Sequence, residues 1–356
     1  MDQKLIFTDL VGQVVDDLAA NLGKPDSVVI ADANTAQFVM PLLRNDSKAV
    51  ADARLITIKA GDANKSLDEL ANVWRQLGEM KATRSTLVIN VGGGVVSDLG
   101  GFAASTFKRG MRFINVPTSV LGAVDASIGG KTGINFNGLK NQIGAFNEPV
   151  AAVISTIFFN TLTSQEILSG YAEMLKHGIL EDEATFGKLL AFSPVYPTFN
   201  SAAMMPLLQA SVLTKQRIVE QDLRESGLRK VLNFGHTIGH ALEALGRSRR
   251  QPVPHGYAVA WGMVTETVLS NMKLGFPTDD IHRLADYVLT NYGAYDITCD
   301  DYPALIDAMR QDKKNTNADD INFTLLKAVG DPVIDCVAAT KEIESALDIY
   351  RDLMKI

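Results

Sequence analysis

The chain has 356 residues, of which 46% are hydrophobic and 21% are charged. At roughly 100 to 200 residues per domain, this length favours two domains that each bury a sizeable core. The formal net charge of -7 argues against a protein that binds nucleic acid by neutralising its phosphates. Local clusters of Lys and Arg could still hold a small anion.

The sequence also excludes several locations and cofactor types. The first residues are acidic and lack a basic segment followed by an apolar one, and no window approaches the roughly 18 apolar residues that span a bilayer. We therefore predict neither a signal peptide nor a membrane span. The two cysteines, Cys299 and Cys336, lie outside any C-x-x-C spacing, so neither a thiolate zinc site nor a disulfide framework is expected. A reducing cytoplasm fits these features.

Short apolar, β-branched runs alternate with helical stretches in the first part of the chain. These runs end at Asp32, Ile58, Asn90, Pro117 and Thr156. The alternation predicts a parallel sheet with crossover helices, which is an α/β architecture.

The pattern changes after about residue 160, where strand-like runs largely stop. Thr163 and Glu166 have the spacing of a capping box at the start of a helix. We predict a mostly helical second domain and place the boundary near residue 155.

A glycine turn follows the run that ends at Asn90. Gly92, Gly93 and Gly94 would let a ligand approach the backbone closely, and a helix N-terminus after such a turn can hold a pyrophosphate. The spacing is neither G-x-G-x-x-G nor a P-loop, so a tight turn without a ligand explains it equally well. Asp32, at an earlier strand end, could bind a ribose hydroxyl or cap a helix.

Three of the five histidines, His236, His240 and His255, fall within twenty residues. Arg229 and Asn233 precede them so that the spacings from Arg229 to His240 are four, three and four. On a continuous helix these four side chains would share one stripe. A solvated face would carry Lys and Glu, whereas these groups bind anions, hydroxyls and metals.

Histidines at i and i+4 are typical of a zinc helix, but Thr237 stands where a metalloprotease has its general-base Glu. Peptide hydrolysis is therefore not expected. A catalytic zinc usually has three protein ligands, and His255 and Glu173 are further candidates. Each residue alone could be an ordinary surface or core group, but the set favours metal binding or catalysis. Gly235 and Gly239 would let another backbone pack closely beside the helix.

A stretch between the sheet and the helical part combines glycines with Arg109, Asp125, Lys131, Lys140 and Asn141. Polar residues spaced by glycines in an apolar context favour a lined cavity, and a glycine-rich connection with solvated lysines is the alternative. Other cations could join them to hold a phosphate and a carboxylate. These are Lys176, Lys215, Arg229 and the DKKN run that contains Lys314.

Six stretches between about residues 27 and 330 match a known family in order. They are GGGVVSDLGGFAASTFKRGMRFINVPTS, VDASIGGKTGINFNGLKNQIGAF, SGYAEMLKHG, GLRKVLNFGHTIGHALEA, HGYAVAWGMV and DKKN. On these stretches the chain resembles the 3-dehydroquinate synthase family of the sugar phosphate cyclases. The resemblance implies a Rossmann-like NAD-binding α/β domain over residues 1–155 and a helical metal- and substrate-binding domain over residues 156–356.

The resemblance also implies an activity in the shikimate pathway of aromatic amino acid biosynthesis. It is the conversion of 3-deoxy-D-arabino-heptulosonate 7-phosphate to 3-dehydroquinate and phosphate. A ring hydroxyl is oxidised transiently with NAD, phosphate is eliminated, the carbonyl is reduced again, and an intramolecular aldol reaction closes the carbocycle. A cytoplasmic homodimer is expected, with a small sugar acid phosphate as substrate and no nucleic-acid or membrane partner.

Site residues are carried over from the resemblance one by one. Glu173, His236 and His255 would bind Zn²⁺ or Co²⁺, and His240 would contact the substrate phosphate instead of the metal. The implied NAD contacts are Asp32, Asn34, Asp62, Lys65, Gly93, Gly94, Asp98, Thr118, Ser119, Lys140 and Thr161. The implied substrate residues are Asp125, Lys131, Asn141, Lys176, Lys215, Arg229, Asn233 and Lys314, with Arg109 reaching into the partner subunit's site.

Two positions depart from the family pattern. Ser97 stands where the family commonly has Gly, and Asp62 replaces a usual Glu. A shorter carboxylate at Asp62 would hold the adenosine ribose less well, which bears on NAD affinity and not on the chemistry.

Three alternatives remain beside this interpretation. Another sugar phosphate cyclase is disfavoured because Arg229 and Asn233 suit a substrate that bears a carboxylate. A polyol dehydrogenase of related fold is disfavoured by Lys131, Lys215 and Arg229 together with the DKKN run. A non-catalytic NAD- or metal-binding regulator is disfavoured by the complete set of metal and acid/base residues.

Overall fold

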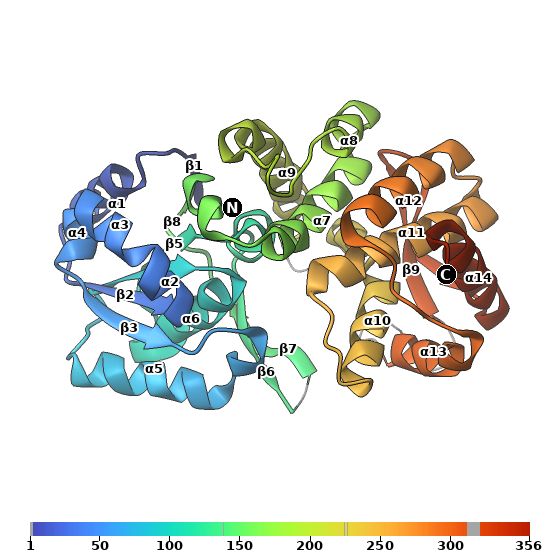
Figure 1. Ribbon diagram of the computed structural model, residues 1–356. Helices are drawn as coiled ribbons and strands as arrows, with labels where there is room; N and C mark the ends of the chain where they lie inside the picture. The colour runs from blue at the N-terminus through green and yellow to red at the C-terminus, as the bar shows by residue number, and fades with distance from the viewer. Residues whose placement is uncertain (1–2, 138, 224, 226, 312–320) are drawn as a thin grey trace. The chain divides into compact units, whose positions relative to one another are not determined.

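The computed structural model describes residues 3–137, 139–223, 225, 227–311 and 321–356 (Figure 1). The chain forms two compact units. The first, here called the sheet unit, comprises Met1–Ile167 and Asn200–Val212, and the second, the helical unit, comprises Leu168–Phe199 and Leu213–Ile356. The boundary near residue 155 stays a prediction.

The sheet unit is built on a six-stranded sheet with the order β1-β8-β5-β4-β2-β3. Every pair of neighbouring strands is parallel, as the alternating pattern predicts. The short edge strand β1 was not predicted, because four residues carry too little periodicity. The strands are β1 (Lys4–Phe7), β2 (Ser27–Asp32), β3 (Arg54–Ile58), β4 (Leu87–Gly92), β5 (Phe113–Pro117) and β8 (Ala151–Ile154).

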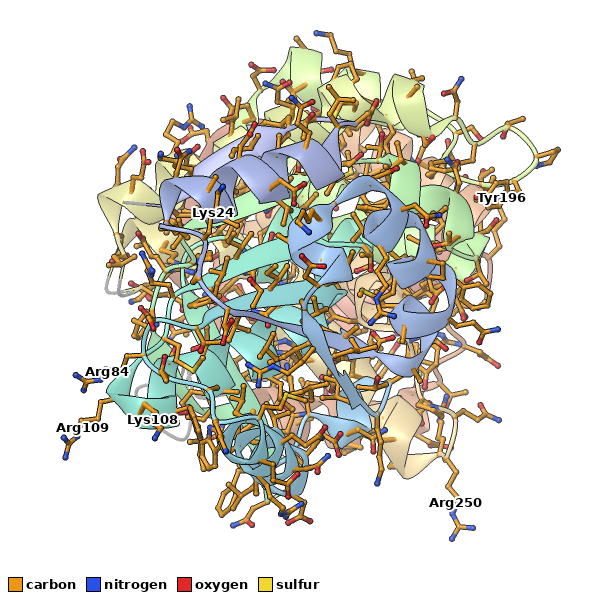
Figure 2. All side chains as sticks on the ribbon, turned by 90° about the vertical axis from the view of Figure 1, so that its left-hand side faces the viewer. Lys24, Arg84, Lys108, Arg109, Tyr196 and Arg250 are labelled. Atoms are coloured by element: carbon orange, nitrogen blue, oxygen red, sulfur yellow. The ribbon has the colours of Figure 1, made fainter. Side chains whose placement is uncertain are left out.

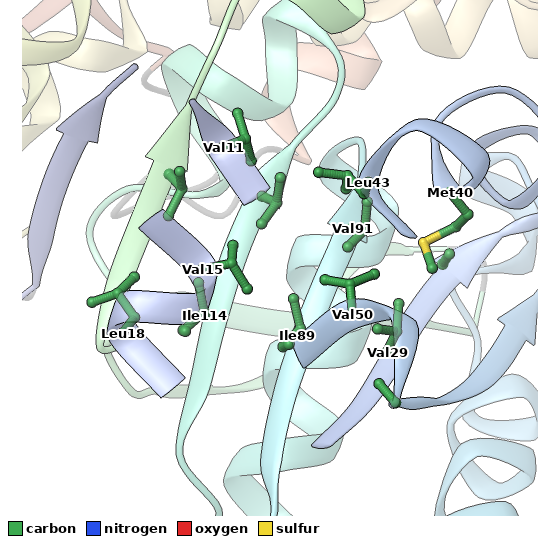
Figure 3. Packing of buried hydrophobic residues seen from close by; sticks show 14 of the residues in the cluster. Val11, Val15, Leu18, Val29, Met40, Leu43, Val50, Ile89, Val91 and Ile114 are labelled. Atoms are coloured by element: carbon green, nitrogen blue, oxygen red, sulfur yellow. The ribbon is translucent and has the colours of Figure 1, made fainter. Parts of the chain in front are cut away.

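Helices cover both faces of this sheet. Figure 3 shows one face, where Val15 of α1 and Met40 of α3 pack on Val29 and Ile89 of the strands. Alternate side chains such as Val28 point to the opposite face, which α5 and α6 cover. Burial on both faces explains why these strands are continuous apolar runs. The helices are α1 (Val11–Asn21), α2 (Ala33–Phe38), α3 (Met40–Asp46), α4 (Lys48–Ala51), α5 (Leu67–Glu79) and α6 (Gly94–Thr106).

The glycine-rich stretch after β5 forms a hairpin that the sequence analysis did not predict. It begins with one π-helical turn, η3 (Gly122–Ala126), and continues as β6 (Lys131–Phe136) paired antiparallel with β7 (Leu139–Phe146). Gly133 and Gly144 lie opposite each other in this pairing, and a Cβ on Gly133 would come within 2.6 Å of the Ile143 carbonyl oxygen. Glycine here serves the close approach of two strands, and most of β7 is exposed.

From α7 (Ser164–Glu181) onward the chain is mostly helical, as predicted. The predicted capping box forms: the Thr163 amide donates to Glu166 Oε2 at 2.8 Å, and the Glu166 amide donates to Thr163 Oγ1 at 3.3 Å. The helices are α7 (Ser164–Glu181), α8 (Glu183–Leu190), α9 (Ser201–Gln221), α10 (His236–Ser248), α11 (His255–Leu274), α12 (Thr278–Tyr292), α13 (Tyr302–Arg310) and α14 (Thr340–Met354).

An antiparallel hairpin of β9 (Ile321–Ala328) and β10 (Asp331–Ala338) also belongs to the helical unit and was missed. Its strands are mixed apolar and polar runs on either side of a turn that contains Gly330, a signal that the sequence does contain. Among the described residues, no helix has both the length and the apolarity to cross a bilayer.

Candidate metal centre and active site

The histidine helix does not begin where its spacing predicted. Arg229 and Asn233 lie on a separate 3-10 segment, η5 (Leu228–Asn233), and α10 begins only at His236. Gly235 interrupts the helix because its φ is +78°, a left-handed conformation that favours glycine. The expected stripe of four residues on one helix is therefore wrong. His236 and His240 still share a face of α10, with ring centroids 5.4 Å apart.

Three side chains from three helices converge on one point. Glu173 comes from the middle of α7, His236 is the first residue of α10, and His255 is the first residue of α11. Oε1 of Glu173 lies 3.4 Å from Nε2 of His236 and 3.5 Å from Nε2 of His255. All three ligand atoms lie within 4.8 Å of one another.

The other nitrogen of each imidazole is held by an acceptor. Nδ1 of His236 lies 3.1 Å from the carbonyl oxygen of Phe234, and Nδ1 of His255 lies 3.1 Å from Oε1 of Glu243. A carbonyl or a carboxylate can only accept, so each Nδ1 carries the proton. In the neutral imidazole the Nε2 lone pair then faces Glu173, which is the arrangement of metal-binding histidines with orienting partners.

Glu173 is fully buried, and neither of its carboxylate oxygens accepts a well-formed hydrogen bond from a described residue. Its Oε2 forms an ion pair with Nζ of Lys176, one turn further along α7. Burial raises the pKa of Glu173, but Lys176 and His236 outweigh it and hold the pKa well below its usual range. The carboxylate is therefore ionised, with Oε1 turned toward the two imidazoles.

The pKa values of the two histidines are shifted in opposite directions. Burial and the Lys176 ammonium lower the pKa of His236 to about 4, against the attraction of Glu173. Burial also lowers the pKa of His255, but the nearby Glu173 and Glu243 carboxylates raise it to about 9.

These donors fit a divalent cation. Ligand atoms at about 2.1 Å from a tetrahedral zinc ion are about 3.4 Å apart, and the two oxygen-to-nitrogen distances are 3.4 and 3.5 Å. A second set of possible ligand atoms, on His240, Glu243 and His255, also lies within 4.8 Å. In that set Glu243 already accepts the Nδ1 hydrogen of His255, so we assign it the orienting role.

The other candidates of the helical unit lie on α7, α9, η5 and α10. Lys176 and Lys215 are buried, with 2% and 4% of their surface exposed. Arg229 is equally buried and donates from Nη1 to the Leu223 carbonyl at 2.8 Å. Asn233 donates from Nδ2 to Glu225 Oε1 at 3.0 Å. Sequence reasoning missed Glu225 and Glu243, although Glu243 follows His240 by three residues on the helix face that carries both α10 histidines.

In the sheet unit, candidates gather at the carboxyl edge of the parallel strands. Strand β3 pairs with one edge of β2, whereas β4 pairs with the other edge. α/β sheets typically bind their ligands at the point where the strand order reverses in this way. β2 ends at Asp32 and β4 ends at Gly92, and the N-cap of α6 is Gly93, which has no side chain to cap the helix. The first amides of α6 therefore suit an anion.

The glycine turn packs against the residues that follow β5. A Cβ on Gly93 would come within 2.9 Å of Ser119 Oγ, and a Cβ on Gly94 within 3.3 Å of the Ala126 Cβ. The Thr118 amide donates to the Gly92 carbonyl at 3.0 Å. The structure thus brings Gly93, Gly94, Thr118 and Ser119 together, as expected of a shared site.

A buried lysine connects several of the expected NAD contacts. Nζ of Lys65 donates to Asp98 Oδ2 at 2.9 Å and to Asn141 Oδ1 at 2.7 Å, and lies 3.5 Å from Asp62 Oδ1. Lys140 lies 3.8 Å from the same Asp62 carboxylate. Burial lowers the pKa of Lys65, but Asp98 and Asp62 raise it above its ordinary value. Asn141, expected at the substrate, here joins this network.

The remaining candidates are placed as follows. Asp32 caps α2 by accepting from the Thr35 amide at 2.9 Å, the capping alternative foreseen for it. Asp125 lies on η3, Lys131 is exposed at the start of β6, and Asn34 is exposed on α2. Thr161, at the end of η4 (Ile157–Thr161), donates to the Phe158 carbonyl at 2.7 Å.

Two candidates remain, Arg109 and Lys314. Arg109, at the end of η2 (Phe107–Arg109), is exposed and extends outward near Arg84 and Lys108 (Figure 2). Lys314 and the rest of the DKKN run lie outside the described residues.

Solved structures define the structural class to which this fold belongs. The fold matches 2-epi-5-epi-valiolone synthase from Streptomyces hygroscopicus, solved with NAD⁺ and Zn²⁺, at a TM-score of 0.83 and 22% identity, over 98% of this chain and 97% of that one. It matches 2-deoxy-scyllo-inosose synthase, solved with carbaglucose-6-phosphate, NAD⁺ and Co²⁺, at a TM-score of 0.82 and 21% identity, over 96% and 95%. The chain shares its fold with these two synthases.

Sequence comparison narrows this class to one family. The family models for the 3-dehydroquinate synthase N-terminal and C-terminal regions match residues 55–169 and 170–315. The chain is 42% identical to the 3-dehydroquinate synthase of Parabacteroides distasonis, covering 99% of this chain and 98% of that protein. It is 35% identical to that of Streptococcus equi, covering 88% and 86%. The chain belongs to the 3-dehydroquinate synthase family, as its motifs predicted, and its function is the conversion of 3-deoxy-D-arabino-heptulosonate 7-phosphate to 3-dehydroquinate and phosphate.

Proposed function

We propose that this reaction depends on one divalent cation held by Glu173, His236 and His255, with Zn²⁺ or Co²⁺ as the ion. The observation that carries the proposal is the approach of both Nε2 atoms to Glu173 Oε1, at 3.4 and 3.5 Å, with each Nδ1 oriented by its own acceptor. Such an ion would supply Lewis-acid polarisation of a substrate hydroxyl. Lys176 neutralises the second oxygen of Glu173 and leaves Oε1 to the ion.

In the sheet unit we propose NAD binding at the carboxyl edge of the strands. NAD would supply a transient hydride acceptor without net consumption. The amides at the start of α6 would bind its pyrophosphate, because Gly93 leaves them uncapped. Lys65 orders this region by bridging Asp98 and Asn141. The other proposed contacts are Asp32, Asn34, Asp62, Gly94, Thr118, Ser119, Lys140 and Thr161.

The substrate roles implied by the family resemblance remain proposals for the individual residues. Lys215 and Arg229 are buried cations of the helical unit and suit a phosphate or a carboxylate. His240 would donate to the phosphate from the exposed side of its helix. The charges of Lys215 and Arg229 are in place before the reaction starts, so these side chains would stabilise the leaving group without reorganisation. The further proposed substrate residues are Asp125, Lys131, Asn141, Lys176, Asn233 and Lys314.

We also propose a cytoplasmic homodimer in which Arg109 contributes to the partner subunit's site. The exposed, outward position of Arg109 on the sheet unit supports this role (Figure 2). Crosslinking or light scattering would measure the assembly. Mixing Arg109→Ala subunits with subunits inactive through another residue should restore activity if the site is shared.

Orthophosphate release tests the proposed function. With NAD and zinc present, 3-deoxy-D-arabino-heptulosonate 7-phosphate should release phosphate, whereas sedoheptulose 7-phosphate and glucose 6-phosphate should not. A chelator should stop turnover, and no net NADH should accumulate. Turnover that persists after complete metal removal would contradict the metal centre, and stoichiometric NADH formation would indicate a dehydrogenase instead.

A further inference from the structure

A buried carboxylate outside the metal triad joins the two helices that supply the imidazoles. Glu266 lies on α11, the helix that begins at His255, and is fully buried. Its Oε2 accepts a hydrogen bond of 2.6 Å from the Gly235 amide, and its Oε1 accepts one of 3.1 Å from the Ile238 amide. The two oxygens thus bind the backbone on either side of His236.

This contact replaces the usual helix cap. The first amides of a helix need acceptors, which an N-cap side chain normally supplies. The N-cap of α10 is Gly235, which has no side chain, so Glu266 provides the acceptor from another helix. A carboxylate at this end is also favoured by the helix dipole. Because a buried charge is costly and is often replaceable by apolar residues without loss of stability, its use here suggests a role in geometry.

Helix α10 packs closely against α11. A Cβ on Gly239 would come within 3.1 Å of the Ala258 carbonyl oxygen, and a Cβ on Gly235 within 3.0 Å of the Val259 carbonyl oxygen. A Cβ on Gly262 would overlap the Gly235 carbonyl oxygen. The glycines allow the backbones of α10 and α11 to approach closely. Glu266 then fixes the position of the first turn of α10 relative to α11.

We propose that Glu266 is a positioning residue of the metal centre: it holds the backbone of His236 at the spacing from His255 that one cation requires. The proposal rests on the proposed metal site. Glu266 acts through the Gly235 and Ile238 amides, which lie on either side of His236. A displaced His236 would change both the affinity and the symmetry of the bound ion.

Cobalt binding to the full chain tests the proposal. Co²⁺ affinity would be measured by competition with a chromophoric chelator, and coordination by the visible absorption of the Co²⁺ form. Glu266→Gln presents an amide NH₂ to a backbone N–H, so it should weaken Co²⁺ binding by about 10- to 100-fold and change the absorption bands. Glu266→Asp, which keeps the charge, should recover part of the affinity.

Thr267→Val is the matched control. Thr267 is also fully buried on α11, but its hydroxyl donates only within its own helix, to the Val264 carbonyl at 2.7 Å. This variant should bind Co²⁺ as the original chain does. Folded Glu266→Gln with unchanged affinity and spectrum would overturn the proposal, and so would failure of both Glu266 variants to fold, since the residue would then be structural.

The same titration separates this proposal from the proposed function. If the original chain binds no Co²⁺, or if His236→Ala binds it equally well, the metal centre itself is wrong. If His236→Ala loses Co²⁺ while Glu266→Gln retains it, only the role of Glu266 fails.

Discussion

Replacing Glu243 tests whether the imidazole of His255 is oriented for a cation. Oε1 of Glu243 lies 3.1 Å from Nδ1 of His255, and the Glu243 side chain is only 4% exposed. A buried hydrogen bond to a charged group contributes about 1.5 to 3 kcal/mol. Loss of an orienting partner typically weakens metal binding by about 10- to 100-fold, or about 1.4 to 2.7 kcal/mol. The free energy expected from the hydrogen bond therefore agrees with the free energy expected from weaker metal binding.

Two variants separate the contribution of the Glu243 charge from that of its hydrogen bond to His255. Glu243→Gln keeps an acceptor oxygen but loses the charge, so zinc affinity should fall by about tenfold, whereas Glu243→Ala should cost about 100-fold. Competition with a chromophoric zinc chelator measures both affinities, and phosphate release at excess zinc should recover much of the activity. Glu183→Gln is the control, because Glu183 is exposed at the start of α8 and pairs with Arg283 at 2.6 Å. Zinc affinity of Glu243→Ala within twofold of the original would refute the reasoning.

Three further predictions concern the cofactors and stability. Exhaustive chelation should abolish phosphate release, and Zn²⁺ or Co²⁺ should restore it, whereas restoration by Mg²⁺ alone would argue against nitrogen ligands. Lys65→Met should raise the NAD dissociation constant at least tenfold in a fluorescence titration, because it leaves Asp98 and Asp62 without their shared cation; an unchanged constant would place NAD elsewhere. Asp16→Asn should lower the free energy of unfolding at pH 7 by about 1 to 2 kcal/mol. The reason is that the Asp16 carboxylate accepts hydrogen bonds of 2.7 to 3.0 Å at the start of α4, from Ser47 Oγ and from the Lys48 and Ala49 amides. Burial raises the pKa of Asp16, but these hydrogen bonds lower it overall. The difference in free energy of unfolding between the original chain and the variant should therefore persist above the unfolded pKa of about 3.9, and it should shrink as pH falls through the lower folded pKa. Denaturant unfolding at pH 7 and pH 3 measures this, and a difference that grows toward acid would be inconsistent with it.

The parallel sheet was predictable because strands that are buried on both faces appear in the sequence as continuous apolar runs. Strand β4 is buried throughout and has Asn90 as its single polar side chain, and glycines mark the point where the strand meets a helix. The hairpin of β6 and β7 was not predictable in this way. Most of β7 is exposed, so no alternation of burial marks it, and its glycines suggested a cavity lining instead of closely paired strands.

Some of the site residues were likewise predictable from the sequence, and others were not. The clustered histidines and Glu173 were evident from residue type and spacing, and the structure brings them together. The continuous helix through Arg229 failed because periodicity does not reveal a positive φ at Gly235, which depends on the packing of α11. Glu243 and Glu266 were missed for a related reason. Their partners are ring and backbone nitrogens on other parts of the chain, and such partners leave no trace in local sequence.

Anomalous scattering at the zinc edge from crystals grown with Zn²⁺ tests the central claim most directly. We expect one peak bonded to Glu173 Oε1 and to Nε2 of both His236 and His255, at about 2.0 to 2.2 Å from each. A peak held by His240, Glu243 and His255 without Glu173, or zinc bound away from these side chains altogether, would contradict the account.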